Sequence, residues 1–303
     1  MRQSINFLGL IVLLILILIF ISSIFRDKSK DDLVNPQPWA FFKREEPAEK
    51  EKTLKQVVDE VLQGSEGKYG LVVKNLKTGE EFNLNEDEVF QTASLYKLWV
   101  MATVFEKLKN GELSEEESVI ADIPRLNSIF GIDPNEAELR EGVIQFSVKS
   151  AVEQMITITH NYAAMALIVK MGKSEIDDYL GEHGYAQTIF GDTYTTTASD
   201  VALFYENLYK EVIQNDEYAK KMMDILKRQT VNDRIPKGLP EGTLVAHKTG
   251  DLGQFEHDAG IVFSEGGDFI IVVLTETNHP DKADEKIIEI SKAAFEHFQN
   301  KEN

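Results

Sequence analysis

The stretch FQTASLYKLWVMATVFEKL, residues 90–108, carries the strongest signal in the chain. Its apolar side chains recur at helical spacing, and Asn110–Gly111 would close a helix that we expect over residues 94–109. If Ser94 opens this helix, Ser94 and Lys97 share one face. A lysine that loses its proton in a cleft can be the base that makes a serine nucleophilic. Taken alone, Ser94 is more simply interpreted as an ordinary helix-capping serine.

The composition is that of a globular protein with an acidic surface. The 303 residues include 32 Lys and Arg against 51 Asp and Glu, a formal net charge of -19. Nucleic acid is excluded as a partner, because phosphate backbones need clustered cations. The absence of cysteine excludes disulfides, zinc–thiolate sites, iron–sulfur clusters, a thiol nucleophile and a lipid-modified cysteine anchor. The six histidines are scattered, so we expect no metal and no cofactor.

An uncharged apolar run covers residues 7–25. Its 19 residues can cross a bilayer as one helix, and they favour an uncleaved anchor (residues 1–25) over a signal peptide. The flanking basic residues alone would favour a cytoplasmic C-terminal domain. Residues 26–52 contain three prolines and are predicted to be a flexible linker, followed by one folded domain over 53–303.

The folded region predicts an α+β architecture. Thr53 and Gln56 form a capping box before a helix, and residues 69–76 and 81–84 form a β-hairpin. A long helical block follows, and three strands and an amphipathic helix close the chain. We therefore expect an antiparallel sheet flanked by the terminal helices, with a large inserted all-α lobe and a cleft where the two lobes meet. The later elements are helices at 147–158, 161–171, 174–180, 199–213, 216–228 and 285–298, and strands at 243–248, 258–264 and 268–275.

Two further motifs could line that cleft. Thr159–His160–Asn161 joins two apolar helices, and Lys248–Thr249–Gly250 ends a strand that we expect to be central. A capping junction and a hairpin turn are the simpler interpretations of each motif alone. Similar tetra- and tripeptides at Ser65–Lys68 and Lys77–Gly79 are rejected, because they lie in turns that fix no catalytic geometry.

Together, the order Ser-x-x-Lys, Thr-x-Asn, Lys-Thr-Gly resembles the serine β-lactamase and penicillin-binding protein superfamily. The flanking stretches MITITHNYAAMALI and NDRIPKGLPEGTLVAHKTGDLGQFEHDAGIVF look like the class A β-lactamase-type domain, and the resemblance covers roughly residues 53–300. It implies a β-lactamase/DD-peptidase-like fold.

The resemblance also implies roles for individual residues. Ser94 would be the acylated nucleophile and Lys97 its base, while Thr159, in place of the usual serine, would relay a proton to the leaving nitrogen. The oxyanion hole would consist of the N–H groups of Ser94 and Asp251. The expected substrate-binding residues are Asn161, Lys248, Thr249, Gly250 and Arg234, and a plain surface arginine is the alternative for Arg234.

Two departures from the family pattern stand out. His160 replaces the usual aspartate of the second motif, and we expect it to be a local hydrogen-bonding residue. The stretch where class A β-lactamases carry Glu-x-x-Leu-Asn is short and lacks that pattern. Glu182 and Asp192 are its nearest carboxylates, and neither has the neighbours expected of a substitute base. Because that glutamate activates the deacylating water, the resemblance implies slow hydrolysis of the acyl-enzyme.

The sequence therefore predicts a membrane-anchored serine hydrolase that transfers an acyl group from a β-lactam or a cell-wall peptide. The alternatives are a DD-peptidase-like penicillin-binding enzyme and a non-catalytic cell-wall binding protein with the same fold. The resemblance implies a single-pass protein whose catalytic domain lies outside the cytoplasmic membrane. The flanking basic residues alone would place that domain in the cytoplasm, and the resemblance is given precedence. We expect a monomer. A Ser-His-Asp hydrolase is not supported, since no Gly-x-Ser-x-Gly elbow is present.

Overall fold

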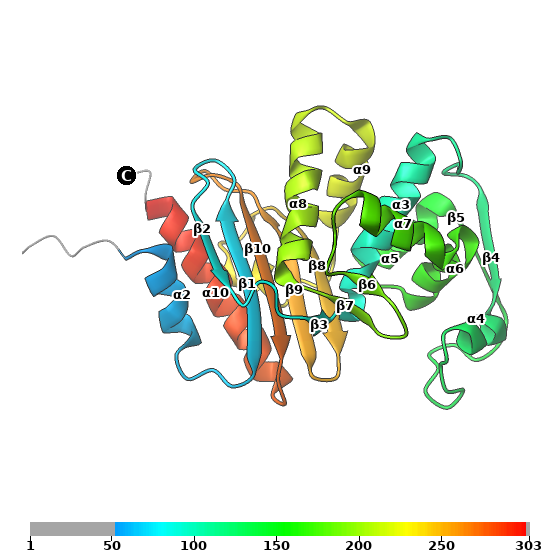
Figure 1. Cartoon of the computed structure of the whole chain (residues 1–303), viewed down its shortest axis with the longest axis horizontal. Helices are drawn as coiled ribbons and strands as arrows, with labels where there is room; N and C mark the ends of the chain where they lie inside the picture. Colours follow the sequence, from blue (N-terminus) through cyan, green and yellow to red (C-terminus); the bar gives the residue numbers. More distant parts are fainter. Residues whose placement is uncertain (1–51, 301–303) are drawn as a thin grey trace, which may run out of the picture. The chain divides into compact units, whose positions relative to one another are not determined.

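A five-stranded antiparallel sheet forms the framework of residues 52–300, the part of the chain that this computed structural model describes (Figure 1). The strand order is β2-β1-β10-β9-β8. The central strand β10 places Val272 opposite Val72 of β1 and opposite Ala259 of β9. The strands are Lys68–Asn75 (β1), Glu81–Leu84 (β2), Val245–Leu252 (β8), Phe255–Val262 (β9) and Phe269–Glu276 (β10).

Both faces of this sheet are covered by helices, because side chains alternate along each strand. One face packs against α2 (Leu54–Leu62) and α10 (Pro280–Asn300), which lie side by side in Figure 1. The Thr53–Gln56 capping box at the start of α2 is present, so this prediction is confirmed. The other face contributes apolar side chains to the core of the helical lobe: Val72, Ala259, Ile261, Ile270, Val272 and Leu274.

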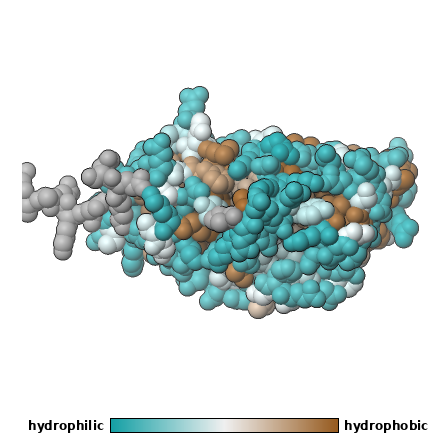
Figure 2. Space-filling view, turned by 90° about the horizontal axis from the view of Figure 1, so that it is seen from above, coloured by the Kyte–Doolittle hydropathy of each residue, from teal (hydrophilic) through white to brown (hydrophobic). Residues whose placement is uncertain are grey.

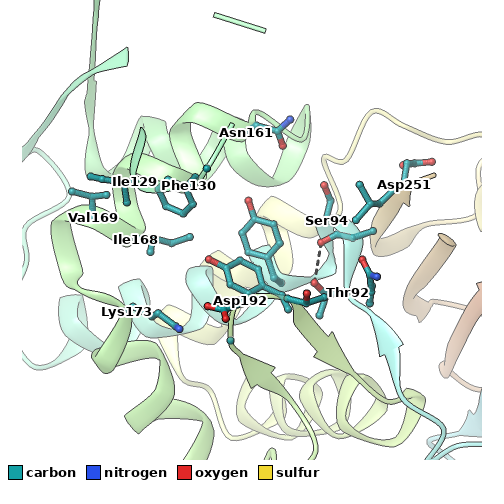
Figure 3. A pocket seen from close by; sticks show the side chains of 18 of the residues that line it. Thr92, Ser94, Ile129, Phe130, Asn161, Ile168, Val169, Lys173, Asp192 and Asp251 are labelled. Carbon is teal, nitrogen blue, oxygen red and sulfur yellow. Dashed lines mark hydrogen bonds between the residues drawn. The ribbon is translucent and has the colours of Figure 1, made fainter. Parts of the chain in front are cut away.

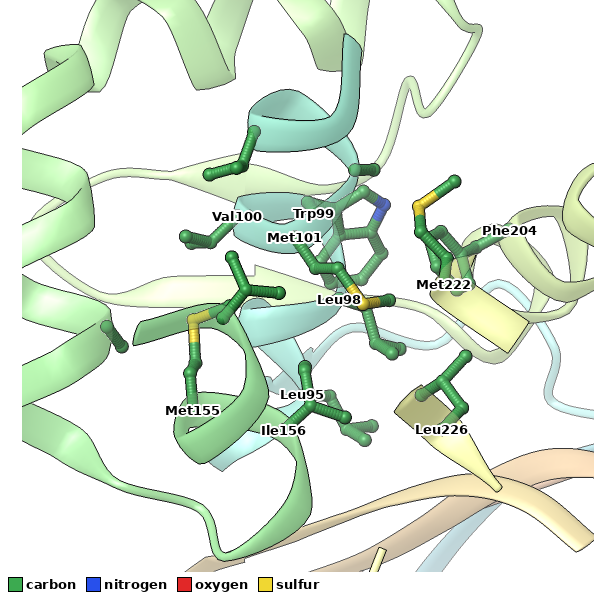
Figure 4. Packing of buried hydrophobic residues seen from close by; sticks show 14 of the residues in the cluster. Leu95, Leu98, Trp99, Val100, Met101, Met155, Ile156, Phe204, Met222 and Leu226 are labelled. Atoms are coloured by element: carbon green, nitrogen blue, oxygen red, sulfur yellow. The ribbon is translucent and has the colours of Figure 1, made fainter. Parts of the chain in front are cut away.

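Helix α3 (Lys97–Lys109) is the buried centre of the helical lobe. Every residue from Lys97 to Phe105 is buried. Figure 4 shows Leu98, Trp99 and Met101 among side chains of the surrounding helices. Because this packing is dense, it fixes the N-terminal end of α3, where Ser94 and Lys97 lie. The other helices are Ile123–Ile129 (α4), Val148–Thr157 (α5), Asn161–Met171 (α6), Lys173–Glu182 (α7), Ala198–Ile213 (α8) and Glu217–Leu226 (α9).

The inserted lobe also contains two small sheets, so the prediction of an all-α lobe is wrong in this detail. Strands β4 (Ser118–Asp122) and β5 (Val143–Ser147) pair as a two-stranded antiparallel sheet. Strands β3 (Phe90–Gln91), β6 (Ile189–Phe190) and β7 (Tyr194–Thr196) form the second sheet, in the order β3-β7-β6. These strands are short, and most pair with partners distant in the chain, so they lack the local hairpin pattern on which sequence prediction relies.

Several predicted boundaries differ from the structure: the last helix begins at Pro280 and not at residue 285, and the strand predicted at 258–264 is Phe255–Val262. Two further corrections concern the site. The helix expected from Ser94 begins as a 3₁₀ turn, η1 (Ala93–Tyr96), before α3. The Lys-Thr-Gly segment does not end a central strand: it lies inside β8, at the edge of the sheet, and β8 continues to Leu252. Glycine and aspartate often end a strand, yet Gly250 and Asp251 pair with His257 and Glu256 of β9. This edge strand contacts η1, which brings the first and third motifs together.

Within residues 52–300, no helix has both the length and the apolar character needed to cross a membrane. The apolar run 7–25 and linker residues 26–51 lie outside the described residues. Figure 2 shows that hydrophilic side chains cover most of one face, with separate hydrophobic patches between them.

Candidate active site

Ser94 lies at the junction of the two lobes, in η1. The residue before it, Ala93, has φ +43°, a backbone conformation that is rare for residues with a Cβ. Ser94 lines a cavity of about 870 Å³, and Asp251 of β8 lines the same cavity. The two residues whose N–H groups were predicted to form the oxyanion hole therefore border one space. Figure 3 shows both on one side of it.

Lys97 is buried and contacts Ser94 and two polar residues of the second motif. Its Nζ lies 3.2 Å from Ser94 Oγ, 2.8 Å from the Thr159 carbonyl oxygen and 2.7 Å from Asn161 Oδ1. Burial, and then the nearby Lys248, lower the pKa of Lys97 to about 6, although Glu138 and Asp251 act in the opposite direction. A large fraction of Lys97 is therefore neutral near pH 7 and can take the Ser94 proton.

Thr159 connects the two lysines of the site. It lies between α5 and α6 with φ +59°, an unusual conformation for a β-branched residue. Its carbonyl accepts a hydrogen bond from Lys97, and its hydroxyl lies 2.9 Å from Lys248 Nζ. Such backbone strain often marks functional sites, and here it turns both polar groups of one residue toward the site.

His160 caps helix α6. Its Nδ1 accepts a hydrogen bond from the Ala163 N–H at 3.2 Å, and its ring lies edge-on to Phe146. His160 is thus a local hydrogen-bonding residue, as we expected.

The Lys-Thr-Gly motif of β8 is buried against η1. Burial above all lowers the pKa of Lys248 to about 7, an effect opposed by Asp258 and Asp251 and increased by Arg234. The hydroxyl of Thr249 is buried without a hydrogen-bond partner in the described structure. A Cβ on Gly250 would lie 3.1 Å from the Thr92 carbonyl oxygen and 3.2 Å from the Ala93 Cβ.

Arg234 does not offer a free guanidinium to a substrate, contrary to our expectation. It is 3% exposed, and its nitrogens bind the carboxylates of Asp251, Glu256 and Asp284. The His257 carbonyl accepts a further hydrogen bond, at 3.1 Å. Three acids share this one cation, and burial together with the neighbouring Asp251 raises the pKa of Glu256 to about 8. Arg234 therefore ties the end of β8 to α10, and its partners are too distant in sequence to be predicted.

The cavity extends from Ser94 into the helical lobe. Figure 3 shows Ile129, Phe130, Ile168 and Val169 on the side opposite Ser94. Asp192 lines the cavity, whereas Glu182 is exposed at the end of α7 and does not. In the described part of the chain, no carboxylate forms a hydrogen bond with Ser94 or Lys97.

Glu138 was missed by the sequence analysis. Its Oε1 accepts a hydrogen bond from Asn161 Nδ2 at 2.9 Å. It lies in a loop with several charged residues, and no spacing or motif distinguishes it from them.

Comparisons with known proteins agree with this geometry. The family model described as "Beta-lactamase enzyme family" matches residues 52–298. Beta-lactamase VEB-1 of Pseudomonas aeruginosa is 22% identical over an alignment of 276 positions that covers 82% of this chain and 91% of that protein. Extended-spectrum beta-lactamase PER-1 of the same organism is 21% identical, with 80% and 86% covered.

Solved structures give the same result. PBP-A has a TM-score of 0.73 and 25% identity, and the match covers 82% of this chain and 98% of that one. A beta-lactamase from Sphaerobacter thermophilus shares the fold, with a TM-score of 0.71, 22% identity and coverage of 82% and 97%. The predicted α+β fold is thereby confirmed. The chain belongs to the beta-lactamase enzyme family and is a serine hydrolase.

Proposed function

We propose that the protein opens β-lactam rings, or cleaves cell-wall peptides, through an acyl ester on Ser94. The observation that carries this proposal is the 3.2 Å distance between Lys97 Nζ and Ser94 Oγ, with Lys97 buried and its pKa lowered to about 6. A buried neutral amine at this distance can accept the hydroxyl proton as the oxygen attacks the substrate carbonyl.

The surrounding groups fit the remaining parts of the reaction. Lys248 and the unpartnered hydroxyl of Thr249 would bind the substrate carboxylate. The N–H groups of Ser94 and Asp251 would stabilise the oxyanion. When the C–N bond breaks, Thr159 would give its proton to the leaving nitrogen and regain one from Lys248, 2.9 Å away, which water then reprotonates. Lys97 would return the Ser94 proton when the ester is hydrolysed. Ser94 keeps the acyl group until water attacks the ester.

Deacylation is proposed to be slow. Within residues 52–300, neither Ser94 nor Lys97 has a carboxylate partner that could activate this water, and Asp192 lines the cavity without contacting either of them. A mutant of PBP-A, 26% identical to this chain with a TM-score of 0.72, was solved as an acyl-enzyme complex with penicillin-G. The same observations favour a second candidate function, a DD-peptidase-like enzyme that acts on peptides.

We also propose that residues 7–25 anchor the enzyme in the cytoplasmic membrane, with the catalytic domain outside. The uncharged 19-residue run supports this proposal, as does the acyl-transfer site, whose proposed substrates are cell-wall peptides and β-lactams. Protease treatment of spheroplasts provides the test. Digestion of the domain in intact spheroplasts supports the proposal, and digestion only after lysis rejects it.

Nitrocefin turnover, followed together with intact mass, tests the enzymatic proposal. We expect a persistent covalent adduct on the wild-type protein, slow turnover, and neither in Ser94→Ala. Rapid turnover without an adduct would refute slow deacylation. If the wild type forms no adduct and gives no turnover, the non-catalytic alternative is favoured.

A further inference from the structure

Glu138 and Lys97 hold the side-chain amide of Asn161 from opposite ends. Asn161 Oδ1 accepts from Lys97 Nζ at 2.7 Å, and Asn161 Nδ2 donates to Glu138 Oε1 at 2.9 Å. If the amide were flipped, its NH₂ would face Lys97 and its oxygen would face a carboxylate. The contact with Glu138 would then lose its donor–acceptor match, and Lys97 could accept from the NH₂ only with the lone pair that it needs for the Ser94 proton, so the two contacts select one orientation.

The backbone beside Glu138 is held firmly, although Glu138 itself is exposed. The N–H of Leu139 donates to the hydroxyl of Tyr162 at 3.1 Å, and the Leu139 carbonyl accepts from Asn127 Nδ2 at 2.8 Å. Tyr162 is buried and directly follows Asn161 in α6. On the other side, Ala137 is buried and its N–H bonds to the Asp133 carbonyl. The acid and the amide that it binds are thus fixed to the same helix.

We propose that Glu138 is a positioning residue that orients Asn161 to bind the acylamino carbonyl of the substrate. An amide nitrogen has two hydrogens, and Glu138 takes one of them. The other is left for a substrate in the cavity that Asn161 lines. This inference rests on the proposed function. It implies that the enzyme prefers β-lactams and peptides that have an amide next to the reacting carbonyl, and that this preference depends on Glu138.

The test compares two substrates that differ only in the acylamino side chain. Benzylpenicillin has an acylamino group, and penicillanic acid has hydrogen in its place. The rate constant for Ser94 acylation is measured by quenched-flow mass spectrometry. For Glu138→Ala we expect about a tenfold loss with benzylpenicillin, the size of one charge-assisted hydrogen bond, and no comparable loss with penicillanic acid. Glu138→Gln, whose amide oxygen can still accept from Asn161, should restore most of the benzylpenicillin rate.

Two controls separate positioning from a general structural effect. Glu136 lies in the same loop, is exposed and has no side-chain hydrogen bond in the described structure, so Glu136→Ala should behave as wild type with both substrates. In an Asn161→Ala background, Glu138→Ala should have no further selective effect. Equal losses with both substrates, or no loss with either, would overturn the proposal.

A measurement without substrate keeps this inference separate from the proposed function. The side-chain NH₂ signals of Asn161, assigned by their absence in Asn161→Asp, should include one downfield proton that Glu138→Ala abolishes. If the wild type forms no adduct, the proposed function fails, and this spectrum still decides whether Glu138 orients the amide. Unchanged NH₂ signals in Glu138→Ala would overturn the positioning role in either case.

Discussion

The Nζ of Lys248 lies 2.9 Å from the hydroxyl of Thr159, across the junction between the sheet and the helical lobe. The carbonyl of the same threonine lies 2.8 Å from Lys97 Nζ. One residue thus contacts both buried amines with two different groups. Because each lysine repels the charge of the other, their mutual position helps to keep Lys97 neutral.

The hydroxyl of Thr159 is expected to be essential for acylation. Thr159→Ala should reduce the acylation rate constant about 100-fold or more, since proton transfer to the leaving nitrogen is lost. Thr159→Ser keeps the hydroxyl and should acylate close to the wild-type rate. The exposed neighbour Ile158 is the control, and Ile158→Ala should leave the rate unchanged. Normal acylation by Thr159→Ala would show that another group supplies the proton.

The pH profile of acylation should be bell-shaped. The rate should rise with pH through about 6, because Lys97 acts only after it has lost its proton, and fall above about 7, because neutral Lys248 no longer attracts a carboxylate. Apart from Lys248, the charges that affect Lys97 are Glu138 and Asp251. Rate constants measured in small steps of pH test this. A rate that keeps increasing above pH 8 would contradict the role of Lys248 as a cation.

Arg234 is expected to matter for stability more than for substrate affinity. Arg234→Ala leaves three acids without their cation and should lower the free energy of unfolding by about 3 to 5 kcal/mol in urea titrations. Arg228 pairs with Glu153 at the surface, so Arg228→Ala should cost about 1 kcal/mol or less. A fully stable Arg234→Ala protein with weakened penicillin binding would reinstate the substrate role.

We expect that His160 can be replaced by aspartate, the usual residue at this position of the family motif. Aspartate is a good N-cap, so His160→Asp should keep α6 intact and acylate normally. His160→Ala removes the cap and should destabilise the protein by about 1 kcal/mol in thermal unfolding. A loss of acylation in a stable His160→Asp protein would assign the histidine a chemical role.

The sequence predicts the elements whose determinants are local. The helical spacing around Ser94 and Lys97, the cap at Thr53 and the apolar strands that form the main sheet are all visible in single segments. The pairing of β4 with β5 is not, because their register depends on the fold of the intervening loop. Arg234 and Glu138 show the same limit. Their carboxylate and amide partners come from other parts of the chain, so a charge pattern alone could not indicate what they contact.

The packing around Gly250 bears on whether a Lys-Thr-Gly motif in a relative is evidence of catalytic activity. Glycine suits the close approach of β8 to Thr92 and Ala93, because a Cβ would be tightly packed there whether or not a substrate binds. A relative that had lost catalysis could replace Ser94, while the close contact of β8 with η1 would still favour glycine at this position. The glycine of Lys-Thr-Gly is therefore evidence that β8 packs on η1, whereas Ser94, Lys97 and the hydroxyl of Thr159 are the groups whose presence indicates a surviving reaction.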